Sequence, residues 1–237
     1  DIFSPVITCK ITVVTTGDAM PGKDGKGQSI YNGLPLRGGE RVAMRIAANS
    51  DTNKPLDFST NKQDYLYVSS ISNVIIENQR EAFQLNLVSR EAITNETTRV
   101  SGKYPTDAPI DVSVKKIIKD YLKTDKQVSV DETSNTYGFS GNLKRPFNIL
   151  VWLASKAVPK RQDSSAGFLF YQTVDGFNFR SIDSLISSKP RATYEYSDVV
   201  ENQIDSNNDF KILEYNIDRN QNLLEKLRLG AYASFRV

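Results

Sequence analysis

The chemistry open to this chain is narrowed first by what its sequence lacks. The 237 residues include no His and a single Cys, Cys9. The absence of His removes the Ser–His and Cys–His nucleophile pairs and nearly all zinc sites. Cys9 lies in an alternating, β-branched segment, which is typical of a small buried side chain. An activated thiol needs a cationic or helix-terminal setting, and we identify no such setting for Cys9 from the sequence.

Carboxylate pairs stay open as catalytic groups, because glycoside hydrolysis needs only two acids at a fixed separation. Among the 28 acidic residues, Glu195 with Asp198 and Asp163 with Asp175 are candidate pairs. Ordinary surface charges show the same spacing, and nothing in the sequence singles out either pair. We therefore expect a protein that is not an enzyme and that uses no cofactor and no metal.

Three short motifs resemble known sites without meeting their requirements. GKDGKGQS (22–29) lacks the Lys-Ser/Thr pair that follows the last Gly of a phosphate-binding loop, so we interpret it as a mobile loop. GFSG (138–141) lacks the second half of the GxSxG nucleophile elbow. The sequon Asn95-Glu96-Thr97 has a meaning only in a secreted protein.

Composition predicts a folded chain with no membrane insertion. Hydrophobic residues make up 39% of the sequence, and no apolar run is long enough to span a bilayer. The 30 basic and 28 acidic residues nearly cancel, so no overall field favours nucleic acid. The length suits one large or two medium domains. Because the sequence starts at Asp1 and ends in an apparent strand, we expect a segment of a longer protein.

The first 90 residues predict a β unit. Alternating apolar residues favour strands, and the polar segments between them favour turns, which together are typical of a small barrel or sandwich. The expected strands cover residues 6–16, 40–47, 64–76 and 82–88.

The pattern then becomes helical. In DVSVKKIIKDYLK (111–123) the apolar residues follow helical spacing, with Asp111 expected as the N-cap. The opposite side of this helix carries lysines that form either a basic contact patch or a solvated face. They are Lys115, Lys116, Lys119 and Lys123, with Lys126 just beyond.

A second helix is expected in GNLKRPFNILVWLASKAVP (141–159), which contains the only Trp of the chain, Trp152. Pro146 suits a first helical turn, and Pro159 ends the segment. The residues between them are apolar on nearly all sides. We therefore expect this helix to be a buried post at the core, with Trp152 and Phe147 packed inside.

An aromatic hairpin follows. GFLFYQT (167–173) and FNFRSI (177–182) predict two strands joined through Asp175-Gly176, a strong hairpin signal. Their aromatic residues alternate with strand period, which favours core packing over the stacking of nucleic-acid bases. These residues are Phe168, Phe170, Tyr171, Phe177 and Phe179. Beyond them, the sequence predicts a short helical turn at 181–188, further strands, and a helix at 218–231.

The expected fold is mainly β with α insertions, as two β-barrel-like units joined by a helical passage. The predicted boundaries are residues 1–90 for the first unit, 91–160 for a passage with two helices, and 161–237 for an incomplete second unit.

NLKRPFNILVWLASKAVP followed by AGFLFYQTVDGFNFRSIDSL resembles the central baseplate hub family of contractile-tailed, T-even-like bacteriophages. The passages VSVKKIIKDYL, YNIDRNQNLLEKLRLGAY and LPLRGGERVAMRI also look like parts of this family. The structural signature is carried by Pro146, Phe147, Trp152, the five hairpin aromatics, and the Asp175-Gly176 turn.

The resemblance implies a structural virion protein that is assembled in the host cytoplasm. It implies a homotrimeric ring of two β-barrel domains per subunit, which adapts the tail-tube protein above to the trimeric cell-puncturing spike below. DNA would pass through the ring without specific binding. The family offers no catalytic residue to transfer.

Two other hypotheses remain. A β-rich receptor- or carbohydrate-binding module of a tail would expose an aromatic platform. A carboxylate hydrolase attached to a tail would need two close acids in a groove.

Overall fold

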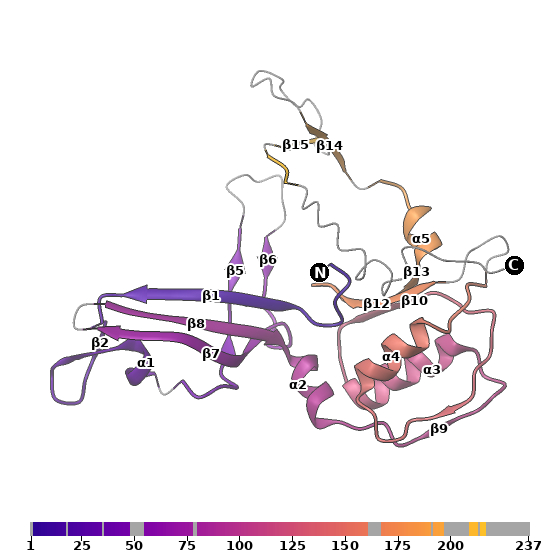
Figure 1. Ribbon diagram of the computed structural model, residues 1–237, viewed down its shortest axis with the longest axis horizontal. Coiled ribbons are helices and arrows are strands. Elements are labelled where there is room, and N and C mark those ends of the chain that lie inside the picture. Colours follow the sequence, from indigo (N-terminus) through magenta and orange to yellow (C-terminus); the bar gives the residue numbers. More distant parts are fainter. Residues whose placement is uncertain are drawn as a thin grey trace, which may run out of the picture. The chain divides into compact units, whose positions relative to one another are not determined.

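The chain divides into two compact units in a computed structural model, residues 1–188 and residues 189–237 (Figure 1). The structure describes residues 2–17, 19–34, 36–47, 55–77, 80–160, 167–190, 192–196, 209–212 and 214–216. The boundaries predicted at residues 90 and 160 both fall inside the first unit, and the three-part division stays a prediction.

A four-stranded antiparallel sheet with the order β1-β8-β7-β4 forms the first half of unit 1. Its strands are β1 (Thr8–Thr15), β4 (Arg41–Val42), β7 (Leu66–Glu77) and β8 (Arg80–Ser89). The three long strands lie side by side in Figure 1. β1 and β8 pair without interruption from Thr8–Val88 to Thr15–Glu81, whereas two irregularities bend β7 against β8. Expected strands 6–16, 64–76 and 82–88 are therefore confirmed, with small shifts at their ends.

The two faces of this sheet differ because the side chains alternate along each strand. Cys9, Leu87 and Val68 share the face that packs on a small hydrophobic core. The other face is polar, and its amide and hydroxyl groups bond to one another. Asn86 donates from Nδ2 to the hydroxyls of Ser70 and Ser72, at 3.0 and 3.2 Å.

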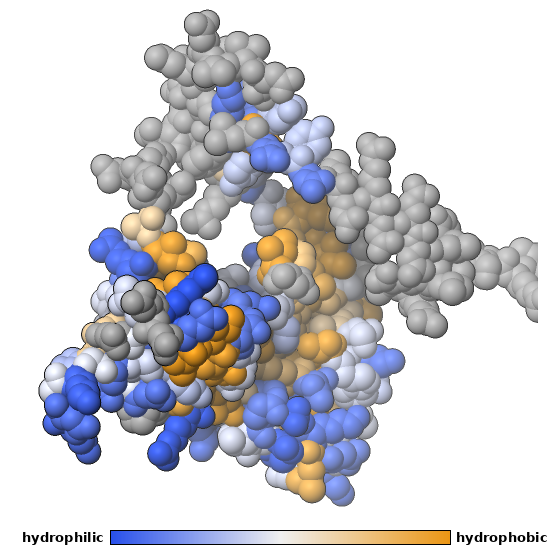
Figure 2. Space-filling view, turned by 60° about the vertical axis from the view of Figure 1, so that its left-hand side comes forward, coloured by the Kyte–Doolittle hydropathy of each residue, from blue (hydrophilic) through white to orange (hydrophobic). Residues whose placement is uncertain are grey.

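Apolar side chains reach the surface at one end of the sheet, beside the β7–β8 turn. Val14 on β1, Ala82 on β8 and Ile75 on β7 lie in one row across the strands, and Val14 and Ile75 are exposed. The neighbouring Val74 and Ile76 are exposed as well. Figure 2 turns this end of the unit toward the reader and shows apolar surface between hydrophilic regions.

Short hairpins extend from the sheet. β2 (Met20–Pro21) pairs with β3 (Gly27–Gln28), and the helical turn α1 (Ile30–Gly33) follows. In the segment 22–29, which the sequence predicted as a mobile loop, Gly27 and Gln28 form β3, and the residues between the two strands form a turn. β5 (Arg45–Ile46) pairs with β6 (Leu56–Asp57). The expected 40–47 strand is split between β4, at the edge of the curled, half-barrel sheet, and β5, in a separate hairpin.

Three helical elements follow the sheet, where the sequence predicted one helix before Pro146. They are α2 (Arg90–Thr97), α3 (Ile110–Ile117) and the π-helical turn η1 (Ile118–Leu122). Asp111 is not the N-cap of α3, since Pro109 occupies that position. The Asp111 carboxylate instead accepts hydrogen bonds from the backbone and hydroxyl of Thr133.

A three-stranded sheet and α4 complete unit 1. The sheet has the order β10-β13-β12, with β10 (Gln127–Val130), β12 (Phe168–Gln172) and β13 (Gly176–Ser181). The remaining elements are β9 (Lys103–Tyr104), β11 (Phe139–Ser140), α4 (Pro146–Ala154) and α5 (Ile182–Ile186). Figure 1 shows α3 and α4 side by side against this sheet. Leu122, Leu150 and Phe179 belong to the large core between the layers.

The aromatic hairpin is confirmed. β12 and β13 pair antiparallel from Phe168–Ser181 to Gln172–Phe177. Gly176 has a φ of 151°, and a Cβ there would collide with the carbonyl of Gln127 on β10. Only glycine satisfies both conditions, so the Asp-Gly turn sets the hairpin and also permits the close approach of β10.

Trp152 differs from the expectation of a buried post. Its side chain is 37% exposed, and Val151 and Val158 are also exposed. Phe147, Leu150 and Leu153 bury the other side of α4. Trp152 packs edge-on against Tyr137 and Phe139, with ring centroids 5.4 and 5.6 Å apart. The helix therefore has an inner and an outer side, which its nearly uniform apolar sequence did not reveal.

Unit 2 contains β14 (Thr193–Tyr196) and β15 (Asp209–Ile212), which pair in parallel. Every residue of β14 is exposed. The predicted helix at 218–231 and the strand after it lie outside the described residues. The β-rich class with helical insertions is confirmed, whereas two barrel units remain a prediction.

Candidate functional site: an open sheet edge and the cleft beside it

The free side of β1 is the first part of the candidate site. Among the described residues, β1 pairs only with β8, so within that part of the chain the backbone donors and acceptors of its other edge have no strand partner. Its sequence TCKITVVT contains one charge, Lys10, no Pro and no bulge. Natural proteins usually protect an edge strand with charges, prolines, bulges or a covering segment. A long, regular, β-branched edge such as this one is suited to pair with another strand.

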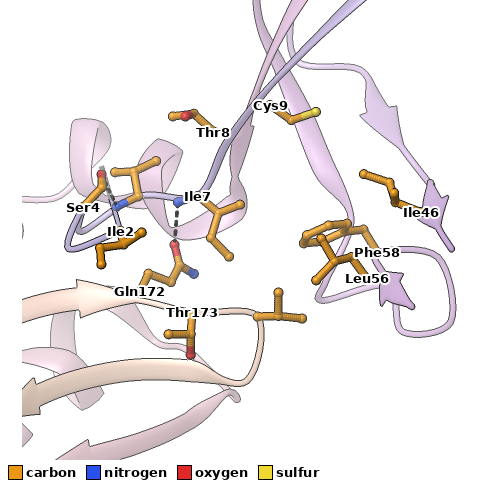
Figure 3. A pocket seen from close by; sticks show the side chains of 12 residues that line it. Ile2, Ser4, Ile7, Thr8, Cys9, Ile46, Leu56, Phe58, Gln172 and Thr173 are labelled. Atoms are coloured by element: carbon orange, nitrogen blue, oxygen red, sulfur yellow. Dashed lines mark hydrogen bonds between the residues drawn. The ribbon is translucent and has the colours of Figure 1, made fainter. Parts of the chain in front are cut away.

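An apolar cleft lies beside the start of this edge. It has a volume of about 470 Å³. Figure 3 shows Ile7 and Cys9 from the β1 segment on one side, Ile46, Leu56 and Phe58 across from them, and Gln172 and Thr173 from the β12 end on a third side. The cleft thus occupies the open side of the half-barrel, between β1 and the β5–β6 hairpin.

A buried hydrogen-bond network fixes the floor of the cleft. The side-chain oxygen of Gln172 accepts hydrogen bonds from the Ser89 hydroxyl at 2.7 Å and from the Ile7 N–H at 3.2 Å. The Gln172 amide donates to Glu91 at 3.3 Å, and the Gln172 N–H donates to the carbonyl of Ser4. One side chain therefore joins the first sheet, α2 and the N-terminal segment to the aromatic hairpin.

An ion pair extends this network. Glu91 is 1% exposed, accepts a hydrogen bond from the Thr124 hydroxyl at 2.9 Å, and lies 3.8 Å from Lys126 Nζ. Lys126 Nζ also lies 3.5 Å from Asp64. A buried carboxylate is tolerated only with partners of this kind. The prediction that Lys126 extends the exposed lysine face is wrong, because its side chain is turned into this network.

A second buried carboxylate anchors the segment after β3. Glu81 on β8 accepts hydrogen bonds from the N–H groups of Ile30 and Tyr31, both at 2.8 Å. Burial disfavours the ionised form of Glu81, but these N–H groups and the hydroxyls of Thr15 and Ser29 outweigh it and hold its pKa below the ordinary value of 4.5. Glu81 is therefore a structural anchor for α1.

The residues of the predicted signature lie in unit 1 and do not line the cleft. Phe147, Phe168, Phe170, Phe177 and Phe179 meet in the large core, and the Phe170 and Phe177 rings stack with centroids 5.7 Å apart. Tyr171 is buried against Phe3 instead. Pro146 begins α4 as expected, and Asp175 is exposed in the hairpin turn. These residues support the fold; the cleft is lined by others.

The lysine face of α3 and η1 is exposed at Lys115, Lys116, Lys119 and Lys123. Lys115 pairs with Asp111 at 3.1 Å, and Lys116 Nζ lies 5.7 Å from the centre of the Tyr104 ring. These contacts stay within the chain, and both interpretations of the face remain open.

The candidate acid pairs gain no support from geometry. Asp163 and Asp198 lie outside the described residues, and Glu195 and Asp175 are exposed in different units. In the described part of the chain, no group of three or more His, Cys, Asp or Glu side chains is placed to hold a metal ion. None of the helices described is long and apolar enough to cross a membrane.

Sequence reasoning missed the cleft and the network beneath it. Their residues come from segments up to 165 positions apart, as in the Ile7–Gln172 hydrogen bond. The sequence feature that could have indicated the site is the low charge of β1, because an edge strand that is protected against pairing usually carries several charged residues.

No protein-family model and no curated protein matches the chain. The solved structures that are similar to parts of the chain include the following two. One is a 43 kDa tail protein of prophage MuSo2 from Shewanella oneidensis, with 10% identity, a TM-score of 0.48, and 80% of this chain and 54% of that chain covered. The other is an E. coli component of the type VI secretion system, described as similar to tail proteins of bacteriophage T4. It has 9% identity and a TM-score of 0.47, and the match covers 81% of this chain and 45% of that one. The chain spans about half the length of each.

Proposed function

We propose that this chain is a structural component of a phage tail, the central hub of the baseplate, and that it assembles into a homotrimeric ring. The observation that carries the proposal is the edge of β1 that pairs with no other described strand, together with the apolar cleft beside it. A subunit of a ring needs such a surface, since closed assemblies bury exposed edges between neighbours.

The resemblance of the α4 and β12–β13 passages to the hub family supports the same proposal. These passages form a packed unit in which Gly176, Phe147 and the hairpin aromatics serve packing. The described residues of these passages pack against one another and offer no recognisable catalytic group, which suits a protein whose function resides in its surfaces. We propose accordingly that the chain is not an enzyme.

In the assembled virion, the ring would join the tail-tube protein above to the trimeric spike below. The nearly balanced overall charge and the polar face of the first sheet suit a channel through which DNA passes without specific binding. Two barrel-like units per subunit would give a threefold ring a pseudo-sixfold upper surface.

Light scattering across a concentration series tests this proposal. The expected result is a species with three times the 26.6 kDa chain mass that dissociates on dilution. Addition of a trimeric spike protein should shift the equilibrium toward this species, because a partner that binds only the ring stabilises it. A monomer at every concentration, with or without the spike, would contradict the proposal.

A second candidate is a receptor- or carbohydrate-binding module. The observation that favours it is the exposed group Tyr194, Tyr196 and Tyr215 in unit 2, since aromatic side chains in such modules stack on sugars. Glycan-array binding by a monomer, abolished by Tyr194→Ala, would support this function over the hub.

A further inference from the structure

We infer that the outer side of α4 is a docking surface for another protein, one that presents an apolar strip flanked by carboxylates. The docking surface has Val151 and Trp152 in its middle, Leu143 and Lys144 at one end, and Lys156 at the other. The inference goes beyond the proposed ring, because it needs only the packing within unit 1 and no particular oligomeric state.

The docking surface is one exposed stripe along the helix. From residue 144 to residue 156, positions 144, 145, 148, 151, 152, 155 and 156 are exposed, and the positions between them are buried. Residues that recur every three or four positions lie on one face of a helix. A solvated face is normally polar, but here Val151 and Trp152 are 49% and 37% exposed. The middle of the stripe therefore leaves apolar surface in water, which a partner would cover.

Trp152 is held in place by other aromatic rings. Tyr137 and Phe139 meet its ring edge-on, and the Phe139 ring in turn stacks on Tyr104 with centroids 4.3 Å apart. A large side chain that is already fixed loses little conformational freedom when a partner binds. Exposed aromatic residues of this kind, Trp in particular, contribute much of the affinity of protein–protein interfaces. Trp152 is therefore suited to be the anchor of the docking surface.

Leu143 has an unusual backbone conformation in the turn before α4. Its φ is 55° and that of Asn142 is 47°. The Lys144 N–H donates to the carbonyl of Gly141 at 3.0 Å, which closes a turn with two left-handed central residues. Asn and Gly suit such positions, whereas a bulky side chain is disfavoured there. Because Leu143 is also 65% exposed, neither backbone preference nor burial accounts for it, and contact with a partner does.

Charge identifies the kind of partner. Residues 133–160 contain four basic side chains and no Asp or Glu. Two of them, Arg145 and Lys160, pair with glutamates at 2.9 and 2.7 Å. The other two, Lys144 and Lys156, form no ion pair within the described part of the chain and lie at opposite ends of the stripe. The first turn of α4 also lacks an acidic residue, so its positive dipole end lies beside Lys144. Both ends of the apolar strip are therefore complementary to carboxylates.

The fluorescence of Trp152 provides the test, because it is the only Trp of the chain and belongs to the docking surface. Lys144 and Lys156 are roughly 18 Å apart at the helical rise per residue, so the probe is a helical peptide of about 15 residues. It carries Glu at both ends, Leu on one face between them, and no aromatic residue. One control peptide has Lys in place of each Glu, and a second has Ser in place of each Leu.

The expected result is a saturable shift of the Trp152 emission to shorter wavelength with the Glu peptide, because its Leu side chains displace water from the ring. The two control peptides should bind at least roughly 4-fold more weakly at low salt. No saturable shift, or equal binding of the three peptides, would overturn the inference. A shift that appears when the chain alone is concentrated would assign the docking surface to a second copy and overturn the assignment to another protein.

Charge reversal tests the two lysines of the docking surface. The double variant Lys144→Glu with Lys156→Glu should weaken binding of the Glu peptide by roughly 4-fold or more and strengthen binding of the Lys peptide. The matched control is Lys23→Glu with Lys26→Glu, which makes the same change at two exposed positions of the β2–β3 turn and should alter neither affinity. Equal effects of the two double variants would show that only the overall charge matters and would contradict the docking surface.

Leu143→Asn separates binding from folding. Asn tolerates a left-handed backbone, so this variant should resist urea at least as well as the unmodified chain. It should nevertheless bind the Glu peptide roughly 3-fold or more weakly, because an apolar contact is lost. Lower stability with unchanged binding would show that Leu143 serves only the fold and would remove it from the docking surface. A monomer that binds the Glu peptide would support this inference and contradict the ring, whereas a trimer that ignores the peptide would do the reverse.

Discussion

The side-chain oxygen of Gln172, at the end of β12, accepts a 2.7 Å hydrogen bond from the hydroxyl of Ser89, at the end of β8. This contact joins the last residue of the first sheet to the aromatic hairpin across 83 positions of the sequence. Both residues are buried. The position of the cleft floor relative to β1 therefore depends on a polar contact as well as on apolar packing.

Replacement of Gln172 tests that dependence. Gln172→Leu removes the acceptor for the Ser89 hydroxyl and the Ile7 N–H together with the donor to Glu91. Each buried polar group left without a partner lowers the stability of the fold by about 1–3 kcal/mol. We therefore expect the free energy of unfolding to fall by at least about 2 kcal/mol. Urea denaturation measures it. Gln63→Leu, which removes an exposed hydrogen bond to Asp125, is the control and should change stability little. Equal losses in the two variants would contradict the role of Gln172.

Lys126 and Lys119 allow a buried and an exposed lysine to be compared. Lys126→Met leaves the Glu91 carboxylate buried without a cation, so we expect a loss of about 3 kcal/mol in the free energy of unfolding. Lys119→Glu, on the exposed lysine face, should change it by less than about 0.5 kcal/mol. If Lys119→Glu instead abolishes binding of a spike or tube partner while stability is kept, the face is a contact patch.

Substitutions of Leu150 and Trp152 test the buried and the exposed side of α4 separately. Leu150 is fully buried, so Leu150→Ala should lower the free energy of unfolding by about 2–5 kcal/mol. Trp152→Ala removes two edge-on aromatic contacts from a partly exposed position, and we expect a smaller loss of about 1–3 kcal/mol. Chemical denaturation of both variants in parallel checks the order. A larger loss for Trp152 would restore it as the main anchor of the helix.

The contrast between α4 and the hairpin shows what the sequence can predict here. Asp175-Gly176 specifies a turn through local backbone preference, so the β12–β13 hairpin was predictable from a few adjacent residues. In α4, apolar residues on nearly all sides remove the periodic signal, so the sequence does not show that Trp152 lies on the outer side, against Tyr137 and Phe139.

α2 was missed for a related reason. Its sequence REAITNET is polar and lacks an apolar stripe. The helix is held by contacts distant in sequence, such as the 2.8 Å hydrogen bond from the Phe147 N–H to Asn95. The same limit applies to the candidate site. The free edge of β1 and the cleft are formed where β1, β6 and the end of β12 come together in the fold. Short sequence patterns predict single strands, but they do not predict which distant strands lie side by side.

Glu81 predicts a specific dependence of stability on pH. Its pKa in the folded protein is below the ordinary value of 4.5, so at acidic pH the unfolded chain binds more protons at this site than the folded chain does. The stabilisation is therefore complete above the unfolded pKa and is lost as the pH falls through the folded value. Protonation also weakens the acceptor for the Ile30 and Tyr31 N–H groups, which should release α1 from β8.

Denaturation midpoints measured between about pH 7 and pH 3 test this prediction through the variant Glu81→Gln. The variant should be less stable at neutral pH, because an amide cannot accept both N–H groups as well as a carboxylate does. Its stability should then fall less steeply below about pH 5 than that of the unmodified chain. Some slope should remain, since the pKa values of Asp111, Glu40 and Asp57 are also lowered in the folded state. Parallel curves for the two proteins would show that Glu81 contributes nothing to acid sensitivity and that α1 is anchored by other contacts.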